Sequence, residues 1–157
     1  MLGRGASTTV RAHGGEVESL TSAGSTGAGI RVIRGGRVGF AHCGSIDRDV
    51  LEDTLAEARD NCRFAEPDDA NGLASDDGVA VTPQDMFEEA VVAFPVEDKV
   101  DLALEVERRV TTADPRVTTA RTTTYGDGWG QAVLVSTAGM RRSSEHTSCS
   151  VGTQPHA

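Results

Sequence analysis

The sequence lacks any apolar run long enough to span a bilayer, which takes about 20 consecutive apolar residues. Its opening stretch, MLGRGASTT, also lacks the apolar segment of a secretory signal peptide. These two absences argue against a membrane protein and against secretion. We therefore expect a cytoplasmic location and no membrane partner.

Cysteine is scarce as well. There are three cysteines, Cys43, Cys62 and Cys149, and no two of them form a C-x-x-C pair. An odd number at wide spacing is typical of reduced thiols rather than of a disulfide framework. The cysteines are therefore expected to be free, in keeping with a cytoplasmic location.

Positive charge is in deficit, with 24 acidic residues against 15 basic ones and a net charge of -9. Such a chain repels nucleic-acid phosphates unless its basic residues gather in one patch. The arginines of the expected strands and turns are instead spread out, at Arg31, Arg34, Arg37 and the pair Arg141 and Arg142. We predict no nucleic-acid partner.

Motifs for metal chemistry are missing too. No H-E-x-x-H spacing is present to indicate zinc. His42 is next to Cys43, and Glu145 is next to His146, so in a strand the members of each pair point to opposite faces. Neither pair can readily hold one ion. The sequence predicts no metal ligand, no cofactor-binding residue and no catalytic residue in this chain.

Other ligand motifs fail on spacing. If Gly72 is placed at the invariant glycine of a calcium-binding EF-hand, Gly78 falls where a carboxylate is needed. The glycines match neither a P-loop nor G-x-G-x-x-G. Cys43 is the one thiol worth testing, although core packing is its simpler interpretation. Trp129, in an expected turn, is either an interface anchor or the cover of a strand edge.

The clearest positive signal lies in residues 27–43, GAGIRVIRGGRVGFAHC. β-branched residues flank Gly35 and Gly36, a pair that accepts the positive φ angles of a two-residue primed turn. The segment therefore predicts a β-hairpin that is partly apolar on both faces. One face is expected to carry Arg31, Ile33, Val38 and Phe40, and the other Ile30, Val32, Gly39 and Ala41.

Further strands lie on both sides of two long helices. Apolar residues recur at helical spacing over residues 46–63 and 96–112, and a short helix is expected over 84–91 within an acidic loop. This order predicts a single α+β domain over residues 1–157, with a mostly antiparallel sheet and both long helices on one face. The other expected strands are Thr8–Ala12, Glu16–Ser22, Val117–Thr124, Gln131–Ser136 and Met140–Ser150. A turn is expected at 125–128, and residues 152–157 carry no pattern.

The hairpin sequence also begins a longer resemblance. GIRVIRGGRVGFA is followed by EARDN at 57–61, KVDLALEVE at 99–107, DPRV at 114–117 and Tyr-Gly-Asp at 125–127. In this order the runs resemble the N-terminal half of the TldD/PmbA family, whose members are cytosolic metallopeptidases or their non-catalytic partner subunits. The resemblance covers nearly the whole chain. It implies that the family's His-Glu-x-x-x-His motif, and a helix and strand that usually precede the first strand, lie outside this chain.

The resemblance implies a scaffold and substrate-channel domain that acts in proteolysis, holds no zinc itself and is inactive alone. The implied partners are the missing C-terminal half, another TldD/PmbA-like subunit in a homo- or hetero-oligomer, and an unfolded or extended peptide. Such a peptide would add to a Thr-rich strand edge, at either Thr8–Ala12 or Thr118–Thr124. The candidate edge residues are Thr8, Thr9, Arg11, Thr122, Thr123 and Thr124.

A second hypothesis needs no proteolysis. The chain would then be a stand-alone, non-enzymatic interaction module that binds a partner through the partly apolar second face of its sheet. A His-Glu-x-x-x-His segment encoded downstream of Ala157 would favour the peptidase reading over the module. The present residues do not distinguish a catalytic subunit from a partner subunit.

Overall fold

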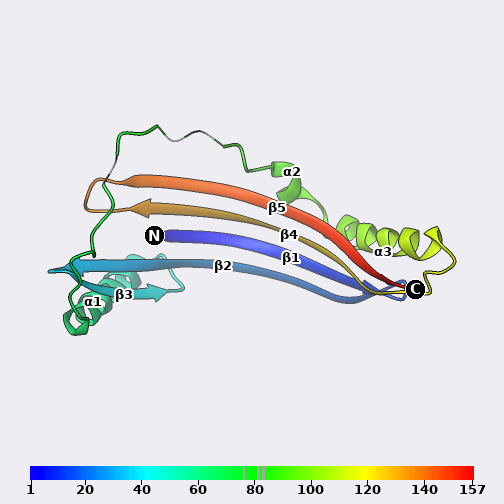
Figure 1. The fold of residues 1–157 in the computed structure, drawn as a ribbon, viewed down its shortest axis with the longest axis horizontal. Coiled ribbons are helices and arrows are strands. Elements are labelled where there is room, and N and C mark those ends of the chain that lie inside the picture. The colour runs from blue at the N-terminus through cyan, green and yellow to red at the C-terminus, as the bar shows by residue number, and fades with distance from the viewer. Residues whose placement is uncertain (76, 81, 83) are drawn as a thin grey trace. The chain divides into compact units, whose positions relative to one another are not determined.

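The chain forms a five-stranded sheet with three helices, seen in a computed structural model that describes residues 1–75, 77–80, 82 and 84–157. The strand order is β3-β2-β1-β4-β5 (Figure 1). This architecture confirms the predicted α+β class and antiparallel sheet. In chain order the elements are β1 (Leu2–His13), β2 (Glu16–Arg34), β3 (Arg37–Cys43), α1 (Arg48–Phe64), α2 (Glu89–Ala93), α3 (Val96–Ala113), β4 (Thr119–Val135) and β5 (Arg141–His156).

The contacts divide the chain into two compact units, each built from three separate segments. Unit 1 comprises Met1–Arg4, Ser25–Asp85 and Gln131–Glu145. Unit 2 comprises Gly5–Gly24, Met86–Gly130 and His146–Ala157. Four boundaries fall inside β1, β2, β4 and β5, and the fifth, between Asp85 and Met86, falls in the loop before α2. The expectation of one folding domain over residues 1–157 stays a prediction.

Unit 1 contains the predicted central hairpin, in the predicted register. Ile33 pairs with Val38, and Ile30 pairs with Ala41. Gly35 and Gly36 have φ angles of 57° and 72°, as a primed two-residue turn requires. The main-chain N–H of Asp68 donates a hydrogen bond to the Gly36 carbonyl at 3.0 Å, so the acidic loop begins against this turn.

Helix α1 packs directly on β3 within unit 1 (Figure 1). Its buried residues, Thr54, Ala58 and Cys62, recur every four positions, which is one face of a helix. Gly39 lies beneath them, and a Cβ atom there would collide with the backbone of Ala58 and Cys62. The close approach therefore depends on a glycine. Leu55, one of the apolar residues at helical spacing over 46–63, is only half-buried because it lies beside this face rather than at its centre.

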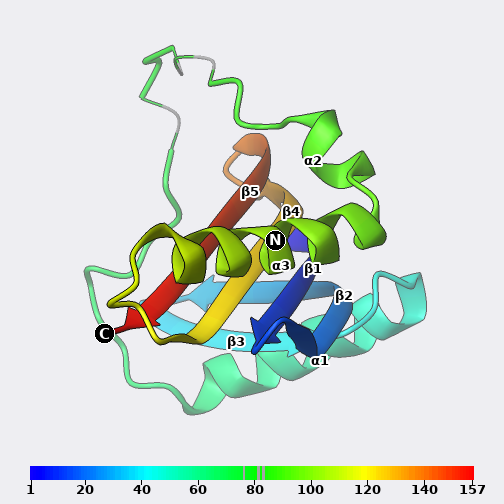
Figure 2. The ribbon, with the colours of Figure 1, turned by 90° about the vertical axis from the view of Figure 1, so that its right-hand side faces the viewer.

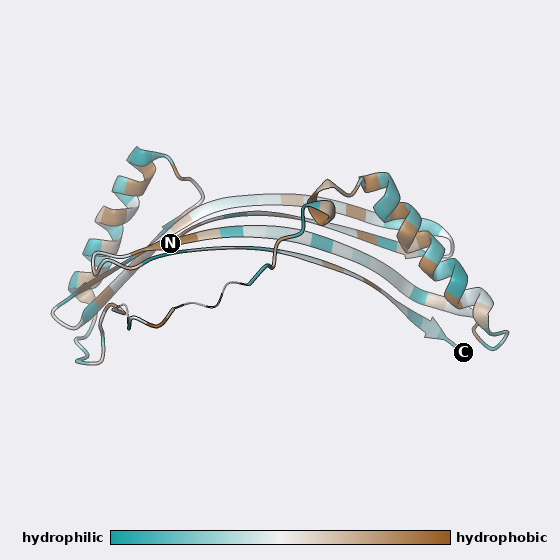
Figure 3. Ribbon diagram, turned by 90° about the horizontal axis from the view of Figure 1, so that it is seen from above, coloured by the Kyte–Doolittle hydropathy of each residue, from teal (hydrophilic) through white to brown (hydrophobic). Residues whose placement is uncertain are grey.

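Unit 2 is organised around α3, which lies across its strands (Figure 2). Val10, Ala12, Ala103 and Tyr125 form its fully buried core. Partly buried apolar side chains pack against that core, namely Phe94, Val100, Leu102 and Leu104. The brown and teal bands that alternate along α3 in Figure 3 mark this amphipathic pattern.

Several expected boundaries are wrong because the strands run further than their alternation indicates. The expected turn at 125–128 lies inside β4, and residues 152–156 belong to β5. Gly126, Gly128 and Gly130 do not have positive φ angles, so they continue the strand instead of reversing it. Glycine is a turn signal in the sequence, but at Gly130 it instead allows close packing, because a Cβ there would lie 2.7 Å from the His146 ring.

The short helix is also displaced from its expected place. It spans Glu89–Ala93 rather than 84–91, and the Glu88 carboxylate caps it by accepting from the Ala90 N–H. Thr82 followed by Pro83 is the start signal of the helix expected over 84–91, and Pro83 lies outside the described residues. The capping residue is an acid near the end of the loop and not Thr82.

Candidate functional site

The sheet order corrects the predicted peptide-binding edges. Thr8, Thr9 and Arg11 lie in β1, which runs between β2 and β4. Thr122, Thr123 and Thr124 lie in β4, which runs between β1 and β5. The two candidate strands are thus neighbours in the interior of the sheet. Threonine enrichment indicates a polar strand but does not reveal its position in the strand order.

Two of these threonines are buried and serve the packing of unit 2. Thr8 is 8% exposed and Thr123 is fully buried. The Thr123 hydroxyl lies 2.8 Å from the Thr153 hydroxyl of β5, so it links two strands. Arg11 is exposed. Main-chain groups of these residues are not available to a peptide, because each strand has a neighbour on both sides.

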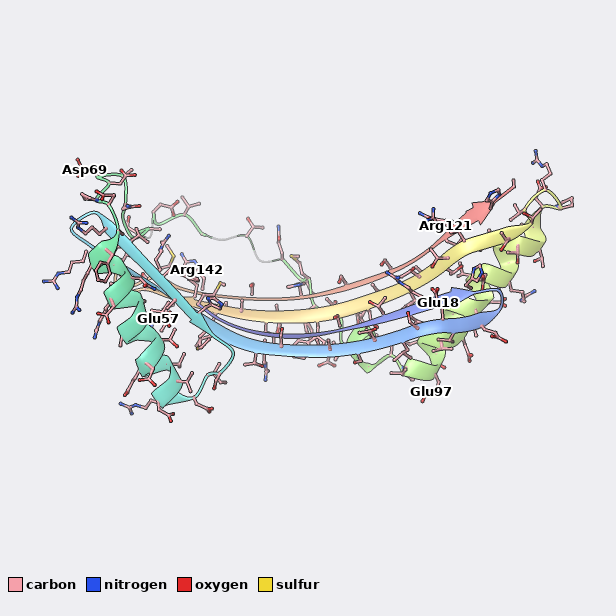
Figure 4. The ribbon with its side chains drawn as sticks, turned by 90° about the horizontal axis from the view of Figure 1, so that it is seen from below. Glu18, Glu57, Asp69, Glu97, Arg121 and Arg142 are labelled. Carbon is pink, nitrogen blue, oxygen red and sulfur yellow. The ribbon has the colours of Figure 1, made fainter. Side chains whose placement is uncertain are left out.

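An open strand edge is found instead on β2. Strand β3 pairs with β2 only from Ala28 to Arg34, so residues 16–27 have a ladder on their β1 side alone among the described residues. Residues 16–26 are all exposed, including the apolar Val17 and Leu20. Glu18, labelled in Figure 4, lies on this stretch. We call residues 16–24, the part within unit 2, the β2 edge.

The opposite edge of the sheet is partly covered within unit 2. The Thr147 N–H of β5 donates to the Met86 carbonyl at 2.9 Å. The Glu88 N–H in turn donates to the Thr147 hydroxyl at 3.0 Å. The segment before α2 therefore occupies main-chain positions on β5 that an added strand would need.

A buried ion pair joins α3 to β4 in the interior of unit 2. Lys99 Nζ lies 2.5 Å from Asp127 Oδ2, and the two side chains are only 6% and 5% exposed. The Tyr125 hydroxyl donates to the same oxygen at 2.7 Å. Charges leave water only when they are paired and hydrogen-bonded, so these three groups depend on one another.

Tyr125 extends this cluster into the core. Its burial, followed by its contacts with Cys149 and Asp127, raises the pKa of the phenol well above its ordinary value of 10. The hydroxyl therefore stays protonated; it donates to the carboxylate and accepts from the Cys149 thiol at 3.5 Å. The Phe94 ring packs against it with centroids 6.2 Å apart. The contacts from Lys99 and Tyr125 hold the Asp127 side chain in position.

A second buried charge on α3 holds the first hairpin turn. Glu107, 3% exposed, accepts hydrogen bonds from the N–H groups of Gly14 and Gly15 at 2.8 and 3.1 Å. Both glycines have positive φ angles, 64° and 81°. A carboxylate with two acceptor oxygens matches two adjacent N–H donors. The hairpin turn and the helix are thereby linked.

A cavity of about 250 Å³ opens beside the ion pair within unit 2. Its polar side comes from Lys99 and Asp127 together with Ser7 and Thr8. Its apolar side comes from Phe94, Trp129 and the valines around α2. Trp129 lies in β4 and not in a turn, so its expected setting was wrong although its candidacy as a contact residue stays open.

The residues singled out for metal or thiol chemistry do not converge. Among residues 1–75, 77–80, 82 and 84–157, no three His, Cys, Asp or Glu side chains are grouped so as to hold a metal ion. His42 stacks on Phe40 with centroids 6.0 Å apart. Cys43 is half-buried, and the Thr54 hydroxyl, more than the Ser45 backbone, lowers the pKa of its thiol. The cysteines are free, as expected.

Sequence reasoning missed both buried charges of α3. Lys99, Ala103 and Glu107 recur every four residues and are the buried residues of that helix. Lysine and glutamate are almost never fully buried unless they are paired, so helical spacing alone places both on the solvent face. One signal was available, because Lys99 is the sole lysine of a chain whose other basic residues are all arginine.

Comparison with protein families agrees with this architecture. The model described as PmbA/TldA metallopeptidase domain 1 matches residues 2–62. The model described as PmbA/TldA metallopeptidase central domain matches residues 90–157. Both matches are to parts of a metallopeptidase, in the order in which the family arranges them. The chain belongs to the PmbA/TldD family, and its sheet is that family's N-terminal part.

Individual relatives give the same assignment. A metalloprotease PmbA homolog from Haemophilus influenzae is 26% identical over 128 residues, which cover 82% of this chain and 28% of the relative. A candidate modulator of DNA gyrase from Bacteroides thetaiotaomicron superposes with a TM-score of 0.83 at 21% identity, covering 97% of this chain and 35% of its own. TldE from Thermococcus kodakarensis superposes with a TM-score of 0.80 at 14% identity, covering 94% and 33%.

This chain corresponds to only part of each protein that it matches. The chain spans about a third of the length of the proteins it matches. The structural matches show the shared fold, and the family assignment shows a proteolysis-related domain. Among the described residues, no helix is long and apolar enough to cross a membrane.

Proposed function

We propose that this chain is the scaffold and substrate-channel domain of a TldD/PmbA-like metallopeptidase or of its non-catalytic partner subunit. The observation that carries the proposal is the ordered match of both family domains, at residues 2–62 and 90–157. The chemistry of peptide-bond hydrolysis then belongs to another region or subunit, where a metal activates water. This domain's part is to hold an extended peptide in reach of that centre.

The β2 edge supplies the means of holding the peptide. Extended peptides add to open sheet edges through main-chain hydrogen bonds, which tolerate many side chains. The peptide takes the place that β3 occupies further along β2, at Ala28 to Arg34. This proposal replaces the interior threonine strands with a surface that the strand order leaves open.

The turn at Gly14 and Gly15 determines which groups of the β2 edge face outward. A two-residue primed turn makes its flanking residues, His13 and Glu16, a hydrogen-bonded pair. Alternation then directs the N–H and C=O groups of Glu16, Glu18, Leu20 and Ser22 toward β1. The groups of Val17, Ser19, Thr21 and Ala23 are directed toward the open side.

Two neighbouring proline variants test this edge. Thr21→Pro removes an outward N–H and leaves the β1 ladder intact, whereas Ser22→Pro removes an N–H that faces β1. We expect Thr21→Pro to keep the melting temperature and to weaken binding of an unstructured, fluorescein-labelled peptide of about ten residues by about 10-fold. Ser22→Pro should instead lower the melting temperature.

Peptide binding is read by fluorescence anisotropy on the 157-residue chain. Unchanged affinity in a folded Thr21→Pro variant would show that the peptide does not use the β2 edge. Loss of binding in both variants with equal loss of stability would mean that the alternation is assigned wrongly. A chain that binds no extended peptide at all would favour the alternative of an interaction module with a folded partner.

A further inference from the structure

The cavity beside Lys99 and Asp127 has hydrogen-bonding capacity that the described residues leave unused. An ammonium group carries three N–H donors, and Lys99 Nζ meets one acceptor among them, Asp127 Oδ2. That oxygen also accepts from Tyr125. The second carboxylate oxygen, Oδ1, takes part in neither of these two contacts. Both residues line the cavity, so a donor pair and an acceptor stand side by side on its polar wall.

The charge of the pair restricts the ligand. Lys99 and Asp127 neutralise each other at 2.5 Å, with only 6% and 5% of their side chains exposed. An anionic ligand placed here would gain from Lys99 but be repelled by Asp127, and a cation would meet the reverse. A neutral group that offers an acceptor next to a donor satisfies both residues at once. A primary carboxamide has this arrangement.

We propose that this cavity is a binding pocket for a neutral primary carboxamide, its carbonyl accepting from Lys99 Nζ and its NH₂ donating to Asp127 Oδ1. The pocket goes beyond the proposed function, since none of its residues belongs to the β2 edge. It binds and orients its ligand, and no covalent step is involved. The amide belongs either to a free small molecule or to an asparagine or glutamine side chain of a peptide.

The size and walls of the cavity fit a small amide with an apolar body. Its volume of about 250 Å³ is below the roughly 300–1,000 Å³ of pockets for drug-sized ligands. Phe94 and Trp129 supply aromatic walls, and Val92 and Val96 supply aliphatic ones. An apolar body between these walls excludes water from the polar contact, which strengthens it. A fragment or a single side chain is the expected occupant.

A series of three isosteric ligands tests the charge argument on the intact chain. Benzamide, benzoate and benzamidine share one shape and differ in carrying no charge, a negative charge and a positive charge. We expect benzamide to bind with a dissociation constant on the order of 1 mM, and the two ions at least about 10-fold more weakly. Lys99 is the sole lysine, so ¹⁵N-lysine labelling gives one Nζ signal that reports binding directly.

A paired substitution tests the residues. Lys99→Met with Asp127→Asn removes both charges together, so no buried charge is left alone, and the new amide still accepts from Tyr125. We expect benzamide binding, followed by Trp129 fluorescence, to weaken by about 10-fold or more with the fold intact by circular dichroism. Asp98→Asn, exposed on the same helix, is the matched control and should bind like the original chain.

Binding of short peptides distinguishes a free small-molecule amide from an amide side chain of a peptide. Blocked tripeptides Gly-Gln-Gly, Gly-Glu-Gly and Gly-norleucine-Gly share their backbone amides and differ only in the side chain. Stronger binding of the glutamine peptide supports a peptide side chain as the occupant, and binding of benzamide alone supports a free amide. Benzoate or benzamidine binding as tightly as benzamide, or no Nζ shift with benzamide, would overturn the proposal even if the paired variant failed to fold.

Discussion

Two charged residues of unit 2 are buried, although charged side chains are usually exposed. Lys99 and Glu107 look like solvent-facing charges of an amphipathic helix, yet both are buried. Their partners, Asp127 on β4 and the Gly14–Gly15 turn, lie far away in the sequence. Helical periodicity reports only which residues share a face of α3. Whether a charge on that face is buried depends on partners that no local pattern contains.

Glu107 provides a stability prediction at this scale. In Glu107→Gln the amide keeps one acceptor oxygen, so one of the two glycine N–H groups loses its hydrogen bond to the carboxylate. That loss should lower the free energy of unfolding by about 1–3 kcal/mol. Urea denaturation measures it, with the exposed Asp101→Asn as a control expected to change stability by no more than about 0.5 kcal/mol. Equal stability of both variants would mean that Glu107 does not clamp the turn.

Glu105 provides a pH prediction. Its hydrogen bonds from Arg108, then Arg109, lower the pKa of the carboxyl from 4.5 to about 2. A carboxyl whose folded pKa is below its unfolded pKa stabilises the fold above pH 4.5, and this contribution is lost as the pH falls toward 2. The side chain is at the surface, so salt should weaken the effect. Carbon-detected NMR titration should give a midpoint that moves toward 4.5 as salt is added; a midpoint already at 4.5 in low salt would contradict these pairs.

Among the secondary-structure elements, local sequence signals predicted the central hairpin but not the full lengths of the strands. The β2–β3 register follows from β-branched alternation and the Gly35–Gly36 turn, all within a few residues. The two long helices follow from periodicity and end within about two residues of prediction. The long strands β4 and β5 are rich in Gly, Ser and Thr, so their strand structure depends on neighbouring strands.

The central turn yields a prediction from two adjacent glycines. Gly35 and Gly36 have similar φ angles, but a Cβ at Gly35 meets nothing within 4 Å, whereas one at Gly36 comes within 2.9 Å of the Asp68 carbonyl oxygen. Asparagine tolerates such angles, so Gly35→Asn should cost no more than about 1 kcal/mol and Gly36→Asn about 2 kcal/mol or more. Thermal melts compare them. Equal melting temperatures would show that the acidic loop does not pack on this turn.

For the molecule as a whole, sequence runs in order predicted the family, and the two family-model matches confirmed it. The peptide-binding edge was not predicted correctly from the sequence. The threonine strands predicted as edges are interior, and the open edge lies on β2. Strand order is set by pairing between distant segments, which a single sequence does not display. The carboxamide pocket likewise needs α3 and β4 brought together.

The proposed function claims that this chain positions peptides and leaves the metal chemistry to another part of the protein. Zinc content by mass spectrometry and cleavage of an unfolded casein substrate, with and without EDTA, test that claim on the purified 157-residue chain. We expect zinc far below stoichiometry and no cleavage, because a catalytic zinc needs three protein ligands and an open position. Stoichiometric zinc, or casein cleavage that EDTA abolishes, would contradict it.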